Sequence, residues 1–368
     1  MNIQRDSELL SRAEKILKEN IYPTSGFPWS PYRCISPAMG KFKGVWNWDT
    51  AFHSVGISRF DTKIAKEGIY GFFQFQKDNG LLPDVIFEDG RVVDTFSKPP
   101  VFPWSIETVY KRDGDLKFLE DLYPKLVLNE NWWVQNRSLK GLFHYDAGNP
   151  DYDDYITRVR YESGWDNSVR WDKGIKEYWA IDLNCFMVMF YRSMSFIAKE
   201  LKISEDAEKW IKKADTLSEL INKKLWNDTI KSYVDVNRFT GEYSEVLTPA
   251  SFMPLYIRIA TEARAQAMAK IAEVNFRSKM PSVSFDNPEF STDYWRGPTW
   301  LNIAYFAAKG LKNYDFPVAD KIKENILDMC YKNKDGIYEN YNSATDEGQR
   351  YDNFSWSCVF IAEFILNF

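Results

Sequence analysis

Two carboxylates lie in short segments rich in aromatic residues, Asp166 within residues 162–168 and Glu339 within residues 338–342. A carboxylic acid beside Trp or Tyr loses hydration, so its pKa rises and it can donate a proton near neutral pH. A second carboxylate that stays ionised can take a proton from water. Such a pair would suit the hydrolysis of a glycosidic bond. The same two acids could instead cap helices or pair with Arg or Lys. These two segments alone do not distinguish a catalytic role from a structural one.

Tryptophan is the other unusual feature, because the chain has 14 Trp and is 17% aromatic. Eight of them lie in or beside segments rich in Gly, Pro, Asp and Asn, and not in amphipathic stretches. A flat indole in a loop can stack on sugar C–H groups while loop polar groups bind hydroxyls, although any single one could also pack in the core. These eight are Trp46, Trp48, Trp104, Trp165, Trp171, Trp295, Trp300 and Trp356.

Composition excludes several other classes of protein. The net charge of −5 and the pI near 5.4 argue against nucleic acid or an anionic membrane as the main partner. The four cysteines are far apart without C-x-x-C spacing, so neither a disulfide framework nor a metal site is expected. The first residues lack the apolar core of a signal peptide, and no apolar run reaches the ~20 residues that span a bilayer. We expect a cytoplasmic enzyme without a metal or cofactor; the sequence leaves its oligomeric state open.

A helical period of apolar residues dominates the chain, and strand signals are few and short, as at residues 232–236. No low-complexity linker interrupts it, so one domain over residues 1–368 is expected. Twelve helices are predicted near residues 7–20, 50–59, 62–77, 102–112, 115–136, 178–200, 204–225, 248–258, 261–275, 298–309, 316–332 and 354–367.

The motif segments all precede or open even-numbered helices of this series. They are residues 44–50, 97–104, 162–168, 247–251, 294–300 and 338–356. In an antiparallel series of hairpins closed into a ring, even-numbered helices point the same way, so these loops would share one face. The pattern predicts an all-α fold, an (α/α)6 toroid of inner and outer helices. The motif loops would form a cup lined with aromatic residues at one end of this toroid. A looser helical solenoid is the alternative, but a solenoid would show sequence repeats, and none is present.

From about Trp46 to Trp356 the chain resembles glycoside hydrolase family 63 and its relatives, the family 37 trehalases. The resemblance rests on the number, order and spacing of several short motifs. They are Trp48-Asp-Thr50, Lys98-Pro-Pro100, Glu162-Ser-Gly-Trp-Asp-Asn167, Ile181-Asp-Leu-Asn184, Tyr294-Trp-Arg-Gly297, Glu339-Asn-Tyr-Asn342 and Phe354-Ser-Trp-Ser357.

The resemblance implies an (α/α)6 barrel that inverts anomeric configuration without a catalytic metal. It implies that Asp166 is the general acid and Glu339 the general base. Inversion needs the two carboxyl groups roughly 6.5–9.5 Å apart, with a water between Glu339 and the anomeric carbon, whereas retention needs roughly 5 Å.

The remaining motif residues are candidates for substrate contacts. Asp49 could hold two sugar hydroxyls or cap the second helix, and Arg296 could grip hydroxyls, tune Glu339 or form a structural ion pair. Lys98 lies on a stiff extended loop before two prolines, and Asn167 and Gln74 have suitable chemistry without an independent signal. The tryptophans predicted to contact substrate are Trp46, Trp48, Trp104, Trp165, Trp295, Trp300 and Trp356.

The chain also departs from its relatives. It has little room beyond the barrel, and the trehalase signatures are absent as such, which puts trehalose specificity in doubt. The compact build looks most like bacterial α-glycosidases that act on small glycosides, including mannosylglycerate and glucosylglycerate. We expect an exo-acting inverting hydrolase that releases terminal glucose or mannose, with a trehalase-like hydrolase as an alternative. For an anionic aglycone such as glycerate, Arg158 and Arg160 are the candidate cations.

Two further alternatives use the same fold class. A sugar 2-epimerase or isomerase would need paired histidines in the cup, but His53 is expected inside the second helix. The other histidine, His144, follows Gly141-Leu-Phe, and neither lies in a motif loop. A non-catalytic sugar-binding relative is argued against by the presence of both carboxylates.

Overall fold

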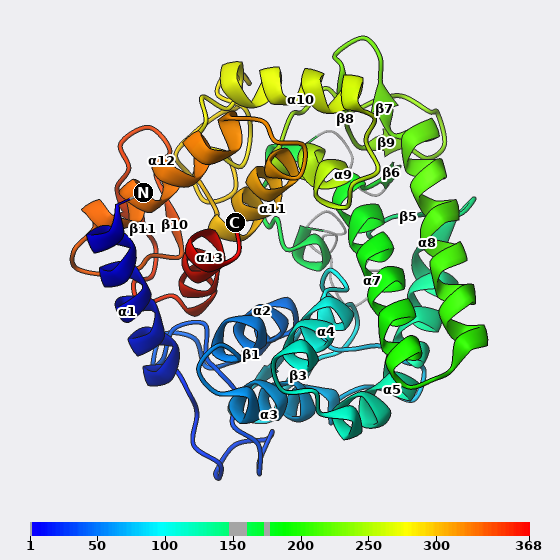
Figure 1. The fold of residues 1–368 in the computed structure, drawn as a ribbon, viewed down its shortest axis with the longest axis vertical. Coiled ribbons are helices and arrows are strands. Elements are labelled where there is room, and N and C mark those ends of the chain that lie inside the picture. Colours follow the sequence, from blue (N-terminus) through cyan, green and yellow to red (C-terminus); the bar gives the residue numbers. More distant parts are fainter. Residues whose placement is uncertain (1, 147–159, 173–176) are drawn as a thin grey trace.

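The computed structural model describes residues 2–146, 160–172 and 177–368, and it is mostly helical (Figure 1). Each of the twelve predicted helices is present, with ends displaced by a few residues. They are α1 (Ile3–Glu19), α2 (Asn47–Ile57), α3 (Thr62–Phe73), α4 (Phe102–Asp113), α5 (Leu116–Arg137), α7 (Ile181–Glu200), α8 (Ser204–Lys224), α9 (Met253–Tyr256), α10 (Glu262–Val274), α11 (Leu301–Lys312), α12 (Val318–Lys332) and α13 (Ser355–Leu366).

The eighth predicted helix, over residues 248–258, is shorter than expected. The structure has a 3-10 turn at Pro249–Phe252 and then the single α turn of α9. Both pieces carry a proline in their first turn, where the missing N–H group is tolerated. Two prolines this close leave no room for a longer regular helix between them.

Alternate helices form an inner series around a common centre, as Figure 1 shows. Helices α2, α4, α7, α9, α11 and α13 contact one another in that order, and α13 returns to contact α2. Helices α1, α3, α5, α8 and α12 pack against the inner series from outside. The even-numbered helices of the sequence prediction are the inner ones, so the loops that lead into them converge.

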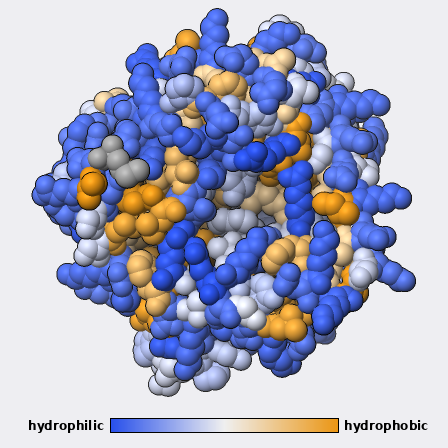
Figure 2. Space-filling view, in the orientation of Figure 1, coloured by the Kyte–Doolittle hydropathy of each residue, from blue (hydrophilic) through white to orange (hydrophobic). Residues whose placement is uncertain are grey.

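Burial follows this division. Every residue of α2 is buried, as expected for a helix with neighbours on all sides. The outer helix α8 buries one stripe at intervals of three or four residues, and the rest of it faces solvent. Hydrophilic residues cover most of the face in Figure 2, with small hydrophobic groups between them. Among the described residues, no helix combines the length and the apolar character that crossing a bilayer requires.

The strands are two or three residues long and join the loops to one another. Strand β1 (Gly44–Trp46), which leads into α2, pairs antiparallel with β2 (Val85–Phe87), and β2 pairs with β3 (Val92–Val93). The predicted strand at residues 232–236 is divided between two of these short strands. The two-stranded pairs are β4 (Ser138–Leu139) with β5 (Leu142–Phe143), β6 (Tyr178–Trp179) with β9 (Val236–Asn237), β7 (Trp226–Asn227) with β8 (Ser232–Tyr233), and β10 (Asn340–Tyr341) with β11 (Gly348–Gln349).

Aromatic side chains fill the centre of the molecule. The ring of Phe52 lies 5.1 Å from that of Phe360, and the ring of Phe306 lies 5.8 Å from Phe360, which joins α2, α11 and α13. Phe52 also contacts Trp48 and Trp356, at 5.7 and 6.2 Å. This cluster therefore supports Trp48 and Trp356, which stand in the first turns of α2 and α13.

Candidate active site

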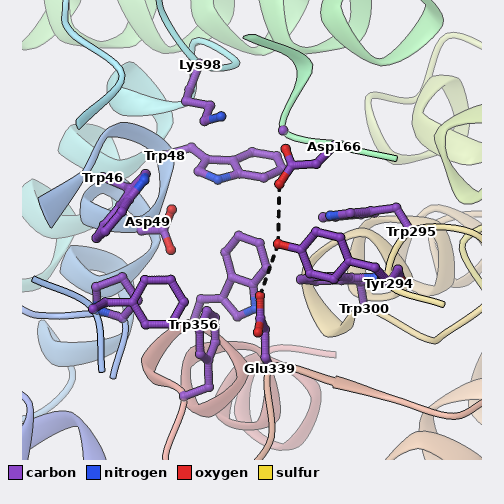
Figure 3. Close-up of a pocket in the computed structure, with 14 residues that line it drawn as sticks. Trp46, Trp48, Asp49, Lys98, Asp166, Tyr294, Trp295, Trp300, Glu339 and Trp356 are labelled. Atoms are coloured by element: carbon purple, nitrogen blue, oxygen red, sulfur yellow. Dashed lines mark hydrogen bonds between the residues drawn. The ribbon is translucent and has the colours of Figure 1, made fainter. Parts of the chain in front are cut away.

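The motif loops enclose a pocket that contains both predicted catalytic carboxylates (Figure 3). Nine of the thirteen side chains predicted to act in catalysis or substrate binding line it. The lining consists of Pro37, Phe42, Trp46, Trp48, Asp49, Lys98, Gly164, Asp166, Tyr294, Trp295, Trp300, Glu339, Phe354 and Trp356.

The hydroxyl group of Tyr294 lies between the two carboxyl groups. It is 3.3 Å from Oδ2 of Asp166 and 3.4 Å from Oε1 of Glu339, as the dashed lines in Figure 3 show. The facing carboxyl oxygens can therefore be no farther apart than these two hydrogen bonds laid end to end. That limit falls near the lower end of the roughly 6.5–9.5 Å typical of inverting glycosidases.

Burial raises the pKa values of three carboxyl groups in this pocket. It raises the pKa of Asp166 to about 6, against the opposing effect of the Lys98 charge. The pKa of Glu339 rises to about 8, through burial and then through repulsion from Asp166 and Asp49. The pKa of Asp49, which is also buried, rises to about 7. Protonation near neutral pH is thus available to all three groups.

Lys98 is the cation among these acids. Its ammonium group lies 3.2 Å from Oδ1 of Asp84 and donates to the backbone carbonyl of Tyr161. Burial alone would lower its pKa, but the charges of Asp84, Asp166 and Asp49 outweigh this and raise it. Lys98 therefore stays charged and links the loop after Leu82 to the loop that carries Asp166.

Buried ion pairs fix the segment that carries Asp166. Glu162 is fully buried and accepts from Nε and Nη2 of Arg137 at 3.0 and 2.8 Å. Four residues after Asp166, the buried Arg170 pairs with Asp182 and Asp235 at 2.8 Å each. A charge removed from water needs such partners, so these ion pairs anchor the segment on both sides of Asp166.

The Arg170 guanidinium also stacks on aromatic rings. It lies 4.8 Å from the ring of Trp165 and 4.3 Å from that of Trp171. The ring of Trp165 packs on Trp295 at 5.0 Å, and Trp295 is stacked on Trp300 at 3.8 Å with an angle of 6°. A continuous stack thus runs from the buried ion cluster to the pocket wall.

Gly164 sits where a side chain cannot. Its φ angle is +75°, and a Cβ atom there would overlap the indole ring of Trp48. We expect Gly164→Ala to destabilise the protein by about 1–3 kcal/mol. We expect kcat/KM to fall at least ~10-fold, because Trp48 or Asp166 must shift. Thermal unfolding and steady-state kinetics measure both effects.

Gly90 is the matched control. Its φ angle is +88°, but nothing lies within 4 Å of a Cβ atom there. Gly90→Ala should therefore show the backbone strain alone, with kcat/KM close to that of the wild type. Equal kinetic losses in the two variants would show that contact with Trp48 is not the cause.

Four of the residues predicted to contact substrate do not line the pocket. Two of these four are tryptophans that pack against other aromatic side chains. Trp104 does not line the pocket; its ring lies 5.9 Å from Phe306 and 6.3 Å from Phe52, in the aromatic centre. Trp165 is buried behind Trp295 and supports it. Both stand in motif segments of the sequence, but neither lines the pocket.

The other two of these four residues, Asn167 and Arg296, connect loops to one another. Asn167 accepts a hydrogen bond from the backbone N–H of Trp295 at 2.8 Å and donates to Asp293 at 2.8 Å. Arg296 donates to both oxygens of Asp172, at 3.0 and 2.7 Å, which is the structural ion pair considered as its alternative. Neither side chain lines the pocket.

Of the remaining sequence candidates, Gln74 and Arg160 are absent from the lining of the pocket. Gln74 donates to the backbone carbonyl of Trp29 at 3.1 Å, at the end of an outer helix. Arg158 lies outside the described residues, and Arg160 lies 3.4 Å from Asp172. Tyr294 had no predicted role, although it opens the Tyr294-Trp-Arg-Gly297 motif. Asp84 had no sequence signal.

Comparison with known proteins identifies the family of this chain. Residues 43–357 match the family described as "Mannosylglycerate hydrolase MGH1-like glycoside hydrolase domain". The chain belongs to this family. It is therefore a glycoside hydrolase related to family 63, as the motifs indicated. Among the described residues, no group of His, Cys, Asp and Glu side chains could hold a metal ion.

Relatives in sequence include hydrolases of two substrates. The mannosylglycerate hydrolase of Rubrobacter radiotolerans is 23% identical over 90% of this chain and 92% of its own length. The periplasmic trehalase of Escherichia coli O1:K1 is 21% identical over 85% of this chain and 62% of its own.

A solved structure with the same fold is the family 63 mannosylglycerate hydrolase of Thermus thermophilus in complex with Tris and D-glycerate. It has a TM-score of 0.80 and 23% identity, over 95% of this chain and 98% of that one. The neutral trehalase Nth1 of Saccharomyces cerevisiae has a TM-score of 0.74 and 18% identity, over 91% of this chain and 74% of that one.

Proposed function

We propose that this enzyme is an inverting, exo-acting hydrolase that releases a terminal mannose or glucose from a small α-glycoside with an anionic aglycone, of which glycerate is the leading candidate. The observation that carries this proposal is the Tyr294 hydroxyl between Asp166 and Glu339, which limits the separation of their facing oxygens to the length of two hydrogen bonds. The name of the matching family and the relative that binds D-glycerate support the choice of aglycone.

We infer that the whole chain, residues 1–368, forms one catalytic (α/α)6 toroid. The closed order of inner helices and the alternation of inner and outer helices along the chain support this inference. A closed ring beneath the pocket would block a longer sugar chain from passing beyond the site of cleavage. The pocket volume of about 80 Å³ leaves no room for a polysaccharide chain.

The proposed reaction is a single displacement. Asp166 gives its proton to the glycosidic oxygen as the bond from the anomeric carbon to that oxygen breaks. Glu339 takes a proton from a water molecule, whose oxygen forms a new bond to the anomeric carbon from the opposite face. The aglycone leaves as an alcohol, and the sugar is released as its β-anomer. Asp49 and Lys98, which line the pocket, are proposed to hold hydroxyls of the bound ring.

The pH dependence follows from the two raised pKa values. With Asp166 near 6 and Glu339 near 8, the pair carries one proton between these values. Below about pH 6 both groups are protonated and no base remains; above about pH 8 both are ionised and no acid remains. We expect a bell-shaped profile of kcat/KM with a maximum near pH 7.

Glu339 has the higher pKa, so in the free enzyme the shared proton lies mainly on Glu339. The reactive form of the enzyme carries this proton on Asp166 instead. The two pKa values of the bell-shaped profile therefore belong to the pair of carboxyl groups and not to either one alone. A profile that stays flat from pH 5 to about pH 9 would contradict a shared proton.

Arg350 is the cation best placed for an anionic aglycone. Its guanidinium lies 4.8 Å from the ring of Tyr294, and its charge lowers the pKa of Glu339, which places it beside the pocket. It is exposed and pairs with Asp293 at 2.7 Å. Arg158 and Arg160 were the sequence candidates for this role.

We expect Arg350→Gln to lower kcat/KM for a mannosyl- or glucosylglycerate about tenfold, the effect of one charged hydrogen bond. The matching methyl α-glycoside, which has no carboxylate, should lose less than about twofold. An equal loss for both substrates would remove Arg350 from aglycone recognition.

A substrate panel tests the proposed function. We expect the highest kcat/KM for a glycosylglycerate, lower values for trehalose, and none for internal bonds of an α-glucan. Faster cleavage of a long oligosaccharide, or internal cuts in it, would contradict an exo-acting pocket. Trehalose as the best substrate would favour a trehalase-like hydrolase.

The epimerase alternative has little support. Burial lowers the pKa of His53 to about 3 and that of His144 to about 4, and neither lines the pocket. Both imidazoles would be neutral and remote from a bound sugar. Incubation with free mannose, followed by analysis for glucose or another epimer, should yield no product.

A further inference from the structure

A second cavity lies on the outer wall of the molecule. It is bounded by α8, by the end of α5 and by the turn that joins β4 to β5, and its volume is about 520 Å³. It shares no lining residue with the pocket that contains Asp166 and Glu339. The lining consists of Val134, Ser138, Gly141, Phe143, Tyr191, Lys209, Lys212, Lys213, Thr216, Leu217 and Leu220.

One end of this cavity is apolar. Phe143 and Leu217 are buried there, and Val134 remains 40% exposed. The turn at Gly141 presses against Leu220, because a Cβ atom on this glycine would lie 2.9 Å from Cδ1 of Leu220. The apolar end of the cavity is therefore bounded by the hairpin of β4 and β5.

The other end is cationic. Lys209, Lys212 and Lys213 come before Leu217 and Leu220 on the same face of α8, and no carboxylate is among the described lining residues. Lys213 is held by the buried Glu130 at 2.7 Å. Lys212 is exposed, and Lys209 lies 5.4 Å from the ring of Trp210.

Helix α8 therefore changes from cationic to apolar between Lys209 and Leu220, a distance of about 16 Å along its axis. Lysines often lie along an apolar helix face with their charge in water, and such a face usually needs no ligand. Here an open volume remains beside them, within the range of roughly 300–1,000 Å³ that small-molecule sites occupy. The positive end also stands out in a chain whose net charge is −5.

We propose that this cavity binds a small amphipathic anion, an aromatic or short-chain carboxylate. Its acid group lies at Lys209 and Lys212, and its apolar body packs against Phe143, Leu217 and Leu220. Both ends of the ligand are needed. A simple anion leaves the apolar end in contact with water, and a neutral hydrocarbon makes no ion pair with Lys209 or Lys212. This site does not depend on the proposed hydrolase reaction.

Isothermal titration with 4-phenylbutyrate tests the proposal, with 4-phenylbutanol as the neutral analogue. We expect saturable binding of the acid with Kd of about 1 mM or tighter, and binding of the alcohol at least ~10-fold weaker. Lys209→Glu with Lys212→Glu, and separately Leu220→Asp, should each weaken binding of the acid at least ~10-fold.

The matched control makes the same change of charge elsewhere. Lys270 on α10 and Lys321 on α12 are both exposed, and Lys270→Glu with Lys321→Glu should leave binding unchanged. All variants should hydrolyse substrate at the wild-type rate, which shows that they are folded. Absence of saturable binding, equal affinity for the alcohol, or equal losses in the control would each overturn the proposal.

Discussion

Replacing Asp166 by Asn, or Glu339 by Gln, should lower kcat by about 10²–10⁴-fold in a protein that remains folded. Asparagine cannot protonate the leaving oxygen, and glutamine cannot take a proton from water. Both replacements keep the shape of the side chain and can still face the Tyr294 hydroxyl. Steady-state and single-turnover kinetics of the purified variants measure the loss.

Thermal unfolding provides the control for this prediction. The folded-state pKa of Glu339 is raised from 4.5 to about 8, so its ionisation destabilises the folded protein increasingly as the pH rises between these values. Glutamine never ionises, and the Tm of Glu339→Gln at pH 8 should equal or exceed that of the wild type. Near wild-type turnover in either folded variant would remove that residue from the mechanism. Azide should not restore Glu339→Gln with retention of configuration.

Replacing Arg170 by Met should destabilise the protein by about 3–5 kcal/mol. Arg170 is fully buried between Asp182 and Asp235, and its loss leaves two carboxylates without a cation. The guanidinium that stacks on Trp165 is lost as well, so the support of Trp295 weakens. Chemical denaturation gives the free energy of unfolding.

A second substitution separates charge from packing. Adding Asp235→Asn to Arg170→Met removes one of the two uncompensated charges, so the double variant should be more stable than Arg170→Met alone. Asp235→Asn by itself should destabilise the wild type, because it weakens the network around Arg170. If the double variant is less stable than either single one, the cluster does not act through charge.

The helices could be predicted from the sequence because each has an apolar period that the fold uses. Helix α8 buries Trp210, Ala214, Leu217 and Ile221 on one side, which is the pattern that predicted it. Apart from the region of β8 and β9, the short strands could not be predicted, since two or three residues have no period to read. In α9, two prolines overrode an apolar run that otherwise suited a longer helix.

The candidate site was predictable to the level of loops but not of side-chain directions. Asp166 and Arg296 both stand in motif loops, yet one faces the cavity and the other pairs with Asp172. Which way a loop residue points depends on partners distant in the sequence, and Asp172 had no signal. Tyr294 was hidden for a similar reason, because only the folded chain brings its hydroxyl between two acids 173 residues apart.

Proton NMR of the first product formed tests the central claim most directly. The enzyme would be mixed with a mannosyl- or glucosyl-α-glycerate, and the anomeric signals followed before mutarotation equilibrates them. Single displacement between Asp166 and Glu339 predicts that the β-sugar appears first and the α-sugar only later. Initial appearance of the α-anomer would mean a retaining mechanism and would contradict the assignment of acid and base made from this pocket.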